Sequence, residues 1–194
     1  GMIYLSDITG TAFKGNLKGD VSYNIMNGEI GVDLTGTGLD AVSAINGAAG
    51  IKNALTGTLN FTANVTTSGA TDIDMIKNLK GNVSFDIQNG AFAGIGRIES
   101  LLSANNIMSN VILKTAVAAL STLPVIKESA NFDYLKGDMT FDGGRANLTS
   151  ITSSGQNVAY YITGKYNILN GTANVIILGR LSADVVAALG PLGE

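Results

Sequence analysis

The chain has 194 residues, a net charge of −3 and a charged fraction of only 14%. Globular domains carry about 25% charged residues, so we expect an unusually neutral surface. Histidine and cysteine are absent from the sequence, which excludes disulfides, thiol nucleophiles, imidazole bases and zinc sites built from these residues. The few basic residues form no cluster, so we expect no nucleic-acid partner.

The chain opens with a glycine before its first methionine. A glycine in this position is typical of a residue left by removal of an affinity tag, so we expect a fragment of a longer protein. We predict one domain over 1–194, since this length suffices for a single core. Its parts are repeat-like strands at 17–66 and 79–92, a helical insertion at 97–123 and C-terminal hairpins at 132–179.

A short motif that begins Leu-Lys-Gly occurs three times. Its copies read LKGDVSYNIMNG (17–28), LKGNVSFDIQNG (79–90) and LKGDMTFDGG (135–144). Apolar and polar residues alternate after each glycine, and this period of two is typical of a strand with one apolar and one polar face. The pairs Asn27-Gly28, Asn89-Gly90 and Gly143-Gly144 then favour tight hairpin turns, because these residue types accept positive φ angles.

The alternation predicts one curved antiparallel sheet with an apolar face. Its expected strands are 21–26, 29–35, 57–66, 82–88, 138–142, 145–152, 158–168 and 172–179, with a last turn at Asn170-Gly171. The predicted fold class is therefore α+β, mainly β: a curved antiparallel sheet of hairpins with an inserted helical segment that covers part of its apolar face.

Helical periodicity appears between the strands. We predict a helix over 39–53, a short helix over 71–79 capped by Thr71, and a last short helix from Ser182 to Gly190-Pro191. The main helical stretch, 97–123, has a narrow polar stripe and ends before Pro124.

This long helix has two open interpretations: it packs on the sheet as ordinary core, or part of its surface faces an apolar ligand or a membrane. If it covers the strand around Val83, Phe85 and Ile87, any open path lies toward the N-terminal strands. The candidate apolar groove consists of Val21, Tyr23, Ile25, Ile30 and Val32.

Carboxylates are the main candidates for chemistry. They are Asp72, Asp74, Asp133, Asp138 and Asp142. Such groups could hold a metal ion or act as an acid and base pair, but a helix start and strand ends explain them better. Glycine-rich stretches at 31–38 and 94–96 lack the order of a phosphate-binding loop. We therefore predict no catalytic, metal or cofactor-binding residues and no enzyme activity.

Four segments carry a family resemblance through their order. They are LTGTLNFTANVTTSG (55–69), LKGNVSFDIQNGAFAGIGRIESLL (79–102), FDYLKGDMTFDGGRANLTSITSSGQNVAYYITGKYNILNGTANVIIL (132–178) and LGPLG (189–193). In this order they resemble the C-terminal region of AsmA-like proteins, a bacterial cell-envelope family that includes TamB-like relatives. The resemblance covers 17–193. It departs from the family at Gly164-Lys165-Tyr166, where members often have a glycine followed by an Ile-Asp-Leu-like run.

The resemblance implies a non-enzymatic domain of a periplasmic protein that is anchored in the inner membrane by a segment absent from this chain. Such proteins look like long β-grooves with an apolar interior, proposed to carry phospholipid toward the outer membrane. A phospholipid or another apolar ligand is the implied partner. The alternative is a purely structural surface or adhesin-like β module with no ligand. The long helix favours the first function, because simple adhesin repeats consist of strand after strand.

Overall fold

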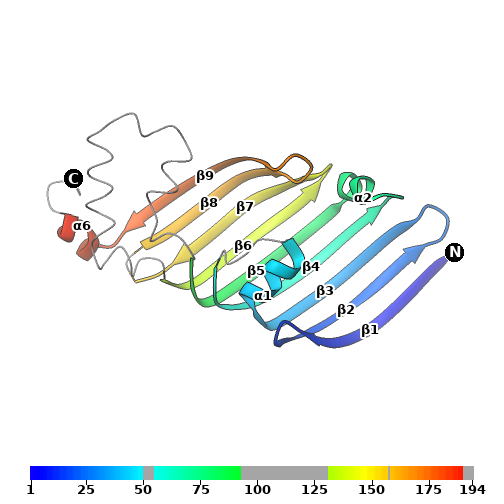
Figure 1. Ribbon diagram of the computed structural model, residues 1–194, viewed down its shortest axis with the longest axis horizontal. Coiled ribbons are helices and arrows are strands. Elements are labelled where there is room, and N and C mark those ends of the chain that lie inside the picture. The colour runs from blue at the N-terminus through cyan, green and yellow to red at the C-terminus, as the bar shows by residue number, and fades with distance from the viewer. Residues whose placement is uncertain (50–54, 93–130, 157, 190–194) are drawn as a thin grey trace.

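The computed structural model describes residues 1–49, 55–92, 131–156 and 158–189 (Figure 1). One open, curved sheet dominates it, with nine strands in the order of the chain and antiparallel neighbours throughout. The strands are β1 (Met2–Ala12), β2 (Gly15–Asn24), β3 (Glu29–Asp40), β4 (Thr58–Ser68), β5 (Lys80–Ala91), β6 (Asn131–Asp142), β7 (Arg145–Ser154), β8 (Val158–Asn167) and β9 (Thr172–Leu181). The predicted curved antiparallel sheet is confirmed.

Three of the predicted hairpin turns are confirmed. Gly28 joins β2 to β3 with a φ of 68°, and its N–H donates a hydrogen bond of 2.8 Å to the carbonyl of Asn24. Gly143 and Gly144, with φ of 57° and 75°, join β6 to β7. Gly171 lies in the turn between β8 and β9. Residues with a Cβ atom rarely adopt these positive φ angles. Glycine at these positions in the sequence therefore predicts the hairpin turns well.

The turn predicted at Asn89-Gly90 is wrong, because both residues lie inside β5. Asn89 does take a positive φ of 50°, but the pairing continues beyond it. Gly90 pairs with Phe132 of β6. On the other side, the N–H of Ala91 donates to Oγ1 of Thr56 at 3.0 Å. Backbone pairing with β6 on one side and with Thr56 on the other therefore continues the strand past a dipeptide that usually forms a turn.

The first strand, β1, has no counterpart in the sequence-based prediction. It is joined to β2 by a turn at Phe13 and Lys14, which have positive φ of 50° and 66°. Neither residue is typical of a tight turn, so the pattern offered no signal there. Lateral hydrogen bonding to β2 along nearly the whole strand overrides the local preference of these two residues.

In the part of the chain that the structure describes, three short helices accompany the sheet: α1 (Ala41–Ala49), α2 (Asp72–Asn78) and α6 (Ala183–Leu189). They fall within the helices predicted over 39–53, 71–79 and 182–190. The predicted cap of α2 is confirmed, because the N–H of Asp74 donates to Oγ1 of Thr71 at 3.2 Å. The predicted helical insertion at 97–123, and with it the predicted cover of the apolar face, lies outside the described residues.

The described core lies where α1 packs on the sheet (Figure 1). Its buried members are Leu39, Ala41, Ala44, Leu59, Ile87, Phe132, Leu135 and Ile151. Small residues of α1 allow the helix to approach the strands closely. The remaining large apolar side chains of this cluster come from β3 to β7, so the central strands hold most of the described core.

Candidate functional site

The register places the predicted groove residues on one face of the sheet. Val21 lies opposite Val32, and Tyr23 lies opposite Ile30, across β2 and β3. Residues directly opposite each other in an antiparallel pair share a face. Four of the five candidates are therefore neighbours on the same surface. Ile25 is the exception, because it follows the end of β2 and lies in the turn.

This surface, which we call the apolar face, continues across all nine strands. One row of paired residues contains Leu5, Val21, Val32, Val65, Gly81, Phe141, Ala146, Tyr166 and Ala173. A second row contains Leu39, Leu59, Ile87, Leu135, Ser153, Tyr160 and Gly179. Neighbouring strands lie about 4.8 Å apart, so the apolar face is about 40 Å wide.

Burial changes along the apolar face. Leu39 and Ile87 are 1% and 3% exposed, whereas Tyr23 is 41% exposed and Leu5 is 58% exposed. The alternation is the same in both regions, so the difference comes from packing: among the described residues β1 has one neighbouring strand, whereas β3 and β5 have two. α1 lies beside β3 and contributes Ala41 and Ala44 to the buried cluster at the centre. Among the described residues, the apolar face is exposed along β1 and at Tyr23 of β2, whereas Val21 is half-buried and Leu17 packs against the core.

Two glycines shape the buried centre of the apolar face. A Cβ on Gly36 would meet the ring of Phe61, and a Cβ on Gly137 would lie 2.6 Å from Ile151 and 3.1 Å from Phe85. Both glycines thus leave room for a large side chain of the neighbouring strand. Such close packing is typical of a core rather than of a ligand-binding surface.

The opposite face of the sheet is polar. One row across it contains Asp20, Asp33, Asn64, Asn82, Thr140, Asn147, Lys165 and Asn174. The side-chain amide of Asn64 donates to Oδ2 of Asp33 at 3.2 Å, and Oγ of Ser84 donates to Asp138. Cross-strand pairs of this kind stabilise a solvated sheet surface modestly.

The two carboxylates predicted at a helix start lie in the first turn of α2. Oγ1 of Thr71 donates to Oδ2 of Asp74 at 2.7 Å, while Asp72 is exposed. Both carboxylates therefore lie at the positive end of the helix dipole. This is the structural role that the sequence predicted for them.

The other three carboxylates lie on β6. Asp133 is exposed near its start, Asp138 accepts from Ser84 at 2.5 Å, and Asp142 lies opposite Arg145 at its end. Across the part of the chain that the structure describes, no three His, Cys, Asp or Glu side chains are placed to hold a metal ion.

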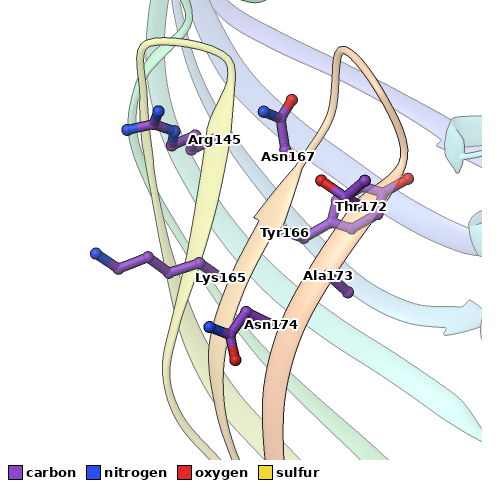
Figure 2. Close-up of a pocket in the computed structure, with 7 residues that line it drawn as sticks. All are labelled: Arg145, Lys165, Tyr166, Asn167, Thr172, Ala173 and Asn174. Atoms are coloured by element: carbon purple, nitrogen blue, oxygen red, sulfur yellow. The ribbon is translucent and has the colours of Figure 1, made fainter.

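A shallow depression of about 250 Å³ lies at one end of β7, β8 and β9. It is lined by Arg145, Lys165, Tyr166, Asn167, Thr172, Ala173 and Asn174, and Figure 2 shows Arg145 and Lys165 projecting to the same side. Sequence reasoning missed it, since Arg145 and Lys165 come from different strands. The register of the β7–β8 pair brings Arg145 opposite Asn167, two residues from Lys165.

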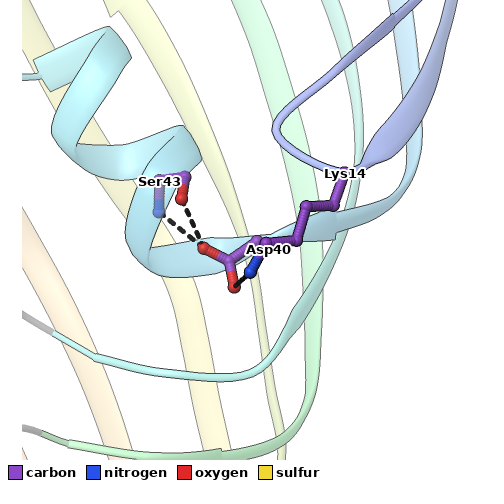
Figure 3. A network of polar contacts seen from close by, with 3 residues as sticks. All are labelled: Lys14, Asp40 and Ser43. Atoms are coloured by element: carbon purple, nitrogen blue, oxygen red, sulfur yellow. Dashed lines mark hydrogen bonds and ion pairs between the residues drawn. The ribbon is translucent and has the colours of Figure 1, made fainter.

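A polar network fixes the start of α1. Oγ and N–H of Ser43 donate to Oδ2 of Asp40 at 2.6 and 3.0 Å, and Nζ of Lys14 lies 3.3 Å from Oδ1 (Figure 3). The hydrogen bonds from Ser43, with a smaller contribution from Lys14, lower the pKa of Asp40. Asp40 thus stabilises the start of the helix that contributes Ala41 and Ala44 to the core, which is a structural role.

Tyr160 is the one aromatic of the apolar face with a shifted pKa among the described residues. Burial raises the pKa of its hydroxyl. Its ring lies edge-on to that of Phe92 at 5.9 Å, and Phe92 contacts Phe132 at 4.8 Å. This aromatic cluster extends the described core toward β8.

Comparison with protein-family models, curated proteins and solved structures gives no match to this chain. In the described parts of the chain, no helix is long and apolar enough to cross a membrane.

Proposed function

We propose that this domain is a non-enzymatic part of the bacterial cell envelope that holds phospholipid acyl chains against its apolar face. One observation carries the proposal: the apolar face is continuous over nine strands, and its side chains are exposed along β1 and at Tyr23 of β2. Large exposed apolar surfaces on soluble domains commonly mark sites of ligand, protein or membrane contact.

The N-terminal part of the apolar face is the proposed binding surface. Ile3, Leu5 and Ile8 of β1 are 45–58% exposed and lie beside Val21 and its neighbours on β2. Burial of a methylene group gains about 0.8 kcal/mol. Several methylene groups on this surface would therefore bind without a charged anchor, which suits a surface that lacks charged side chains in its rows.

The cellular setting in the proposal comes from the resemblance to AsmA-like proteins. The domain would lie in the periplasm, in a protein anchored in the inner membrane, and would act in outer-membrane biogenesis or phospholipid transport. The segment at 97–123 would close the central part of the groove, so that acyl chains enter near Val21 to Val32.

Native mass spectrometry tests the proposal. The 194-residue chain is mixed with vesicles of phosphatidylethanolamine and phosphatidylglycerol and separated from them, and the mass of the intact chain with any bound lipid is measured. We expect a phospholipid adduct on the unmodified chain and its loss in Tyr23→Asp. Thr35→Asp is the matched control, because it adds the same charge to the polar face of the adjacent strand.

Both variants must first show the circular dichroism spectrum of the unmodified chain. An adduct that persists in Tyr23→Asp, or its equal loss in Thr35→Asp, would contradict binding to the apolar face. A chain that acquires no phospholipid at all would favour the alternative, a structural β module without a ligand.

A further inference from the structure

The depression at one end of β7, β8 and β9 gathers four nitrogen-bearing side chains on the polar face of the sheet (Figure 2). Arg145 of β7 lies opposite Asn167 of β8. Lys165 lies two residues before Asn167, on the same face, and is opposite Asn174 of β9. From the strand spacing and the rise per residue, the Cα atoms of Arg145 and Lys165 are about 8 Å apart. Both long side chains can therefore reach one small ligand between them.

The donor groups of these side chains have no partner within the described structure. The guanidinium of Arg145, the ammonium of Lys165 and the side-chain amide of Asn174 form no hydrogen bond or ion pair there. The side-chain oxygen of Asn167 accepts from the backbone N–H groups of residues 169 and 170, at 3.0 and 3.4 Å, in the turn to β9. This turn orients Asn167 by its oxygen and leaves its NH₂ group available as a donor.

Few acceptor groups lie near these donors. The segment 143–183 contains three cations and no carboxylate. On the adjacent β6, Asp142 lies opposite Arg145, and Asp138 accepts a hydrogen bond from β5. Neither carboxylate forms an ion pair with Arg145 or Lys165 in the described structure. Two cations and Asp142 give a net charge of +1 at this end of the polar face, so directed hydrogen bonds rather than a strong field would select the ligand.

We infer that this depression binds a phosphate group. A guanidinium presents paired N–H donors that match two phosphate oxygens, an ammonium adds a compact positive charge, and side-chain amides donate to the remaining oxygens. The depression has a volume of about 250 Å³, which is ample for one phosphate group. A soluble phosphate and the headgroup of a phospholipid share this chemistry, and either could supply the group.

The depression is separate from the surface proposed to hold acyl chains. Arg145 and Lys165 belong to the polar face at the β7 to β9 end of the sheet, whereas Tyr23 belongs to the apolar face at the β1 end. Tyr23→Asp should therefore leave phosphate binding unchanged, and failure of one site would not imply failure of the other.

Nuclear magnetic resonance of the ¹⁵N-labelled 194-residue chain tests the site. The chain is titrated with sodium phosphate, and sodium chloride at equal ionic strength is the control for charge screening. We expect saturable shifts of the Arg145 Nε–H signal and of the side-chain amide signals of Asn167 and Asn174 with phosphate, and no comparable shifts with chloride. Equal shifts in both salts, or no saturation with phosphate, would overturn the site.

Removal of the two cations identifies the residues that bind. Arg145→Gln/Lys165→Gln should weaken phosphate binding by about tenfold or more, because it removes both charge-assisted contacts. Lys18→Gln/Arg180→Gln is the matched control, since it removes the same formal charge from two exposed positions outside the depression. It should bind phosphate like the unmodified chain. Undiminished binding in the first variant, or equal loss in the control, would overturn the assignment, provided that circular dichroism shows both variants to be folded.

Co-sedimentation with phosphatidylglycerol vesicles separates the two sources of phosphate. If a lipid headgroup occupies the depression, vesicle binding should fall in Arg145→Gln/Lys165→Gln and not in Lys18→Gln/Arg180→Gln. If a soluble phosphate occupies it, free phosphate should saturate the site while vesicle binding is the same in both variants. A chain that shows neither saturable binding of free phosphate nor vesicle binding that depends on Arg145 and Lys165 would overturn the inference.

Discussion

The centre of the sheet and its β1 end carry the same alternation of apolar and polar residues, yet only the centre is buried. Ile87 is 3% exposed and Ile3 is 49% exposed, although both lie on the apolar face. The centre includes Ala41 and Ala44 of α1 and contains glycines that leave room for large neighbouring side chains, whereas β1 has only one neighbouring strand among the described residues. The comparison shows that the alternation determines which face of the sheet a side chain points to. Packing against other elements then determines whether that side chain is buried in the core or remains available for contact.

The largest expected effect comes from the same substitution in the two regions. Ile87→Ala should lower the free energy of unfolding by about 2–5 kcal/mol, because it leaves a cavity in the core. Ile3→Ala should change it by less than about 0.5 kcal/mol, because the side chain is half exposed. Urea unfolding followed by circular dichroism measures both. Equal losses would mean that the β1 end is as well packed as the centre.

Glycine substitutions should differ in sign between the two regions. Gly36→Ala should cost about 1–3 kcal/mol, because its Cβ would overlap the ring of Phe61. Gly10→Ala should be neutral or stabilising by up to about 1 kcal/mol, because nothing lies within 4 Å and alanine suits a strand better. Thermal unfolding of the two variants gives the comparison. Stabilisation by Gly36→Ala would show that the centre is loosely packed.

The exposed helix α2 should contribute less to stability than α1, which supplies two core residues. α2 contains no buried residue, so the loss of its cap in Thr71→Ala should cost only about 1 kcal/mol. Thr71→Ser keeps the hydroxyl and is the control. We expect amide hydrogen exchange to accelerate within α2 alone. Faster exchange in β4 or β5 would show that α2 supports the sheet more than its exposure indicates.

The smallest expected effect is the pH dependence contributed by Asp40. Its pKa is lowered in the folded chain, chiefly by Ser43, so its ionised form stabilises the fold above the ordinary aspartate pKa of about 3.9. This contribution is lost as pH falls through the lowered pKa. Thermal unfolding between about pH 5 and pH 2.5 should therefore depend less on pH in Asp40→Asn than in the unmodified chain.

Two further variants separate the causes of this shift. Ser43→Ala should reduce the pH dependence more than Lys14→Met, because the hydrogen bonds of Ser43 contribute most to the lowered pKa. An equal reduction in both variants would assign the effect to the ion pair instead.

The sequence predicted the sheet because tight turns and alternation are local properties. Gly28 and Gly143-Gly144 located their hairpins, and the hairpins in turn gave the register that puts Val21 opposite Val32. The sequence did not predict β1, because its turn to β2 uses Phe13 and Lys14, whose positive φ follows from pairing with β2. The false turn at Asn89-Gly90 has the same origin: hydrogen bonds on both sides overrode a local signal.

The candidate site was predictable only in part. Four groove residues share a face because the alternation requires it, and Ile25 does not because the strand ends before it. Their exposure depends on tertiary packing around each strand, which periodicity does not report. The depression between Arg145 and Lys165 arises from cross-strand register and leaves no contiguous motif in the sequence.

Photo-crosslinking tests the central claim most directly. A benzoylphenylalanine residue is placed at Tyr23, at Phe85 or at Thr35, and each folded chain is irradiated with phospholipid vesicles. We expect a phospholipid crosslink at position 23, on the exposed part of the apolar face, and none at position 85, whose half-buried side chain packs against the core, or at position 35 on the polar face. Crosslinks of equal yield at positions 23 and 35, or none at position 23, would contradict an open apolar face that holds acyl chains.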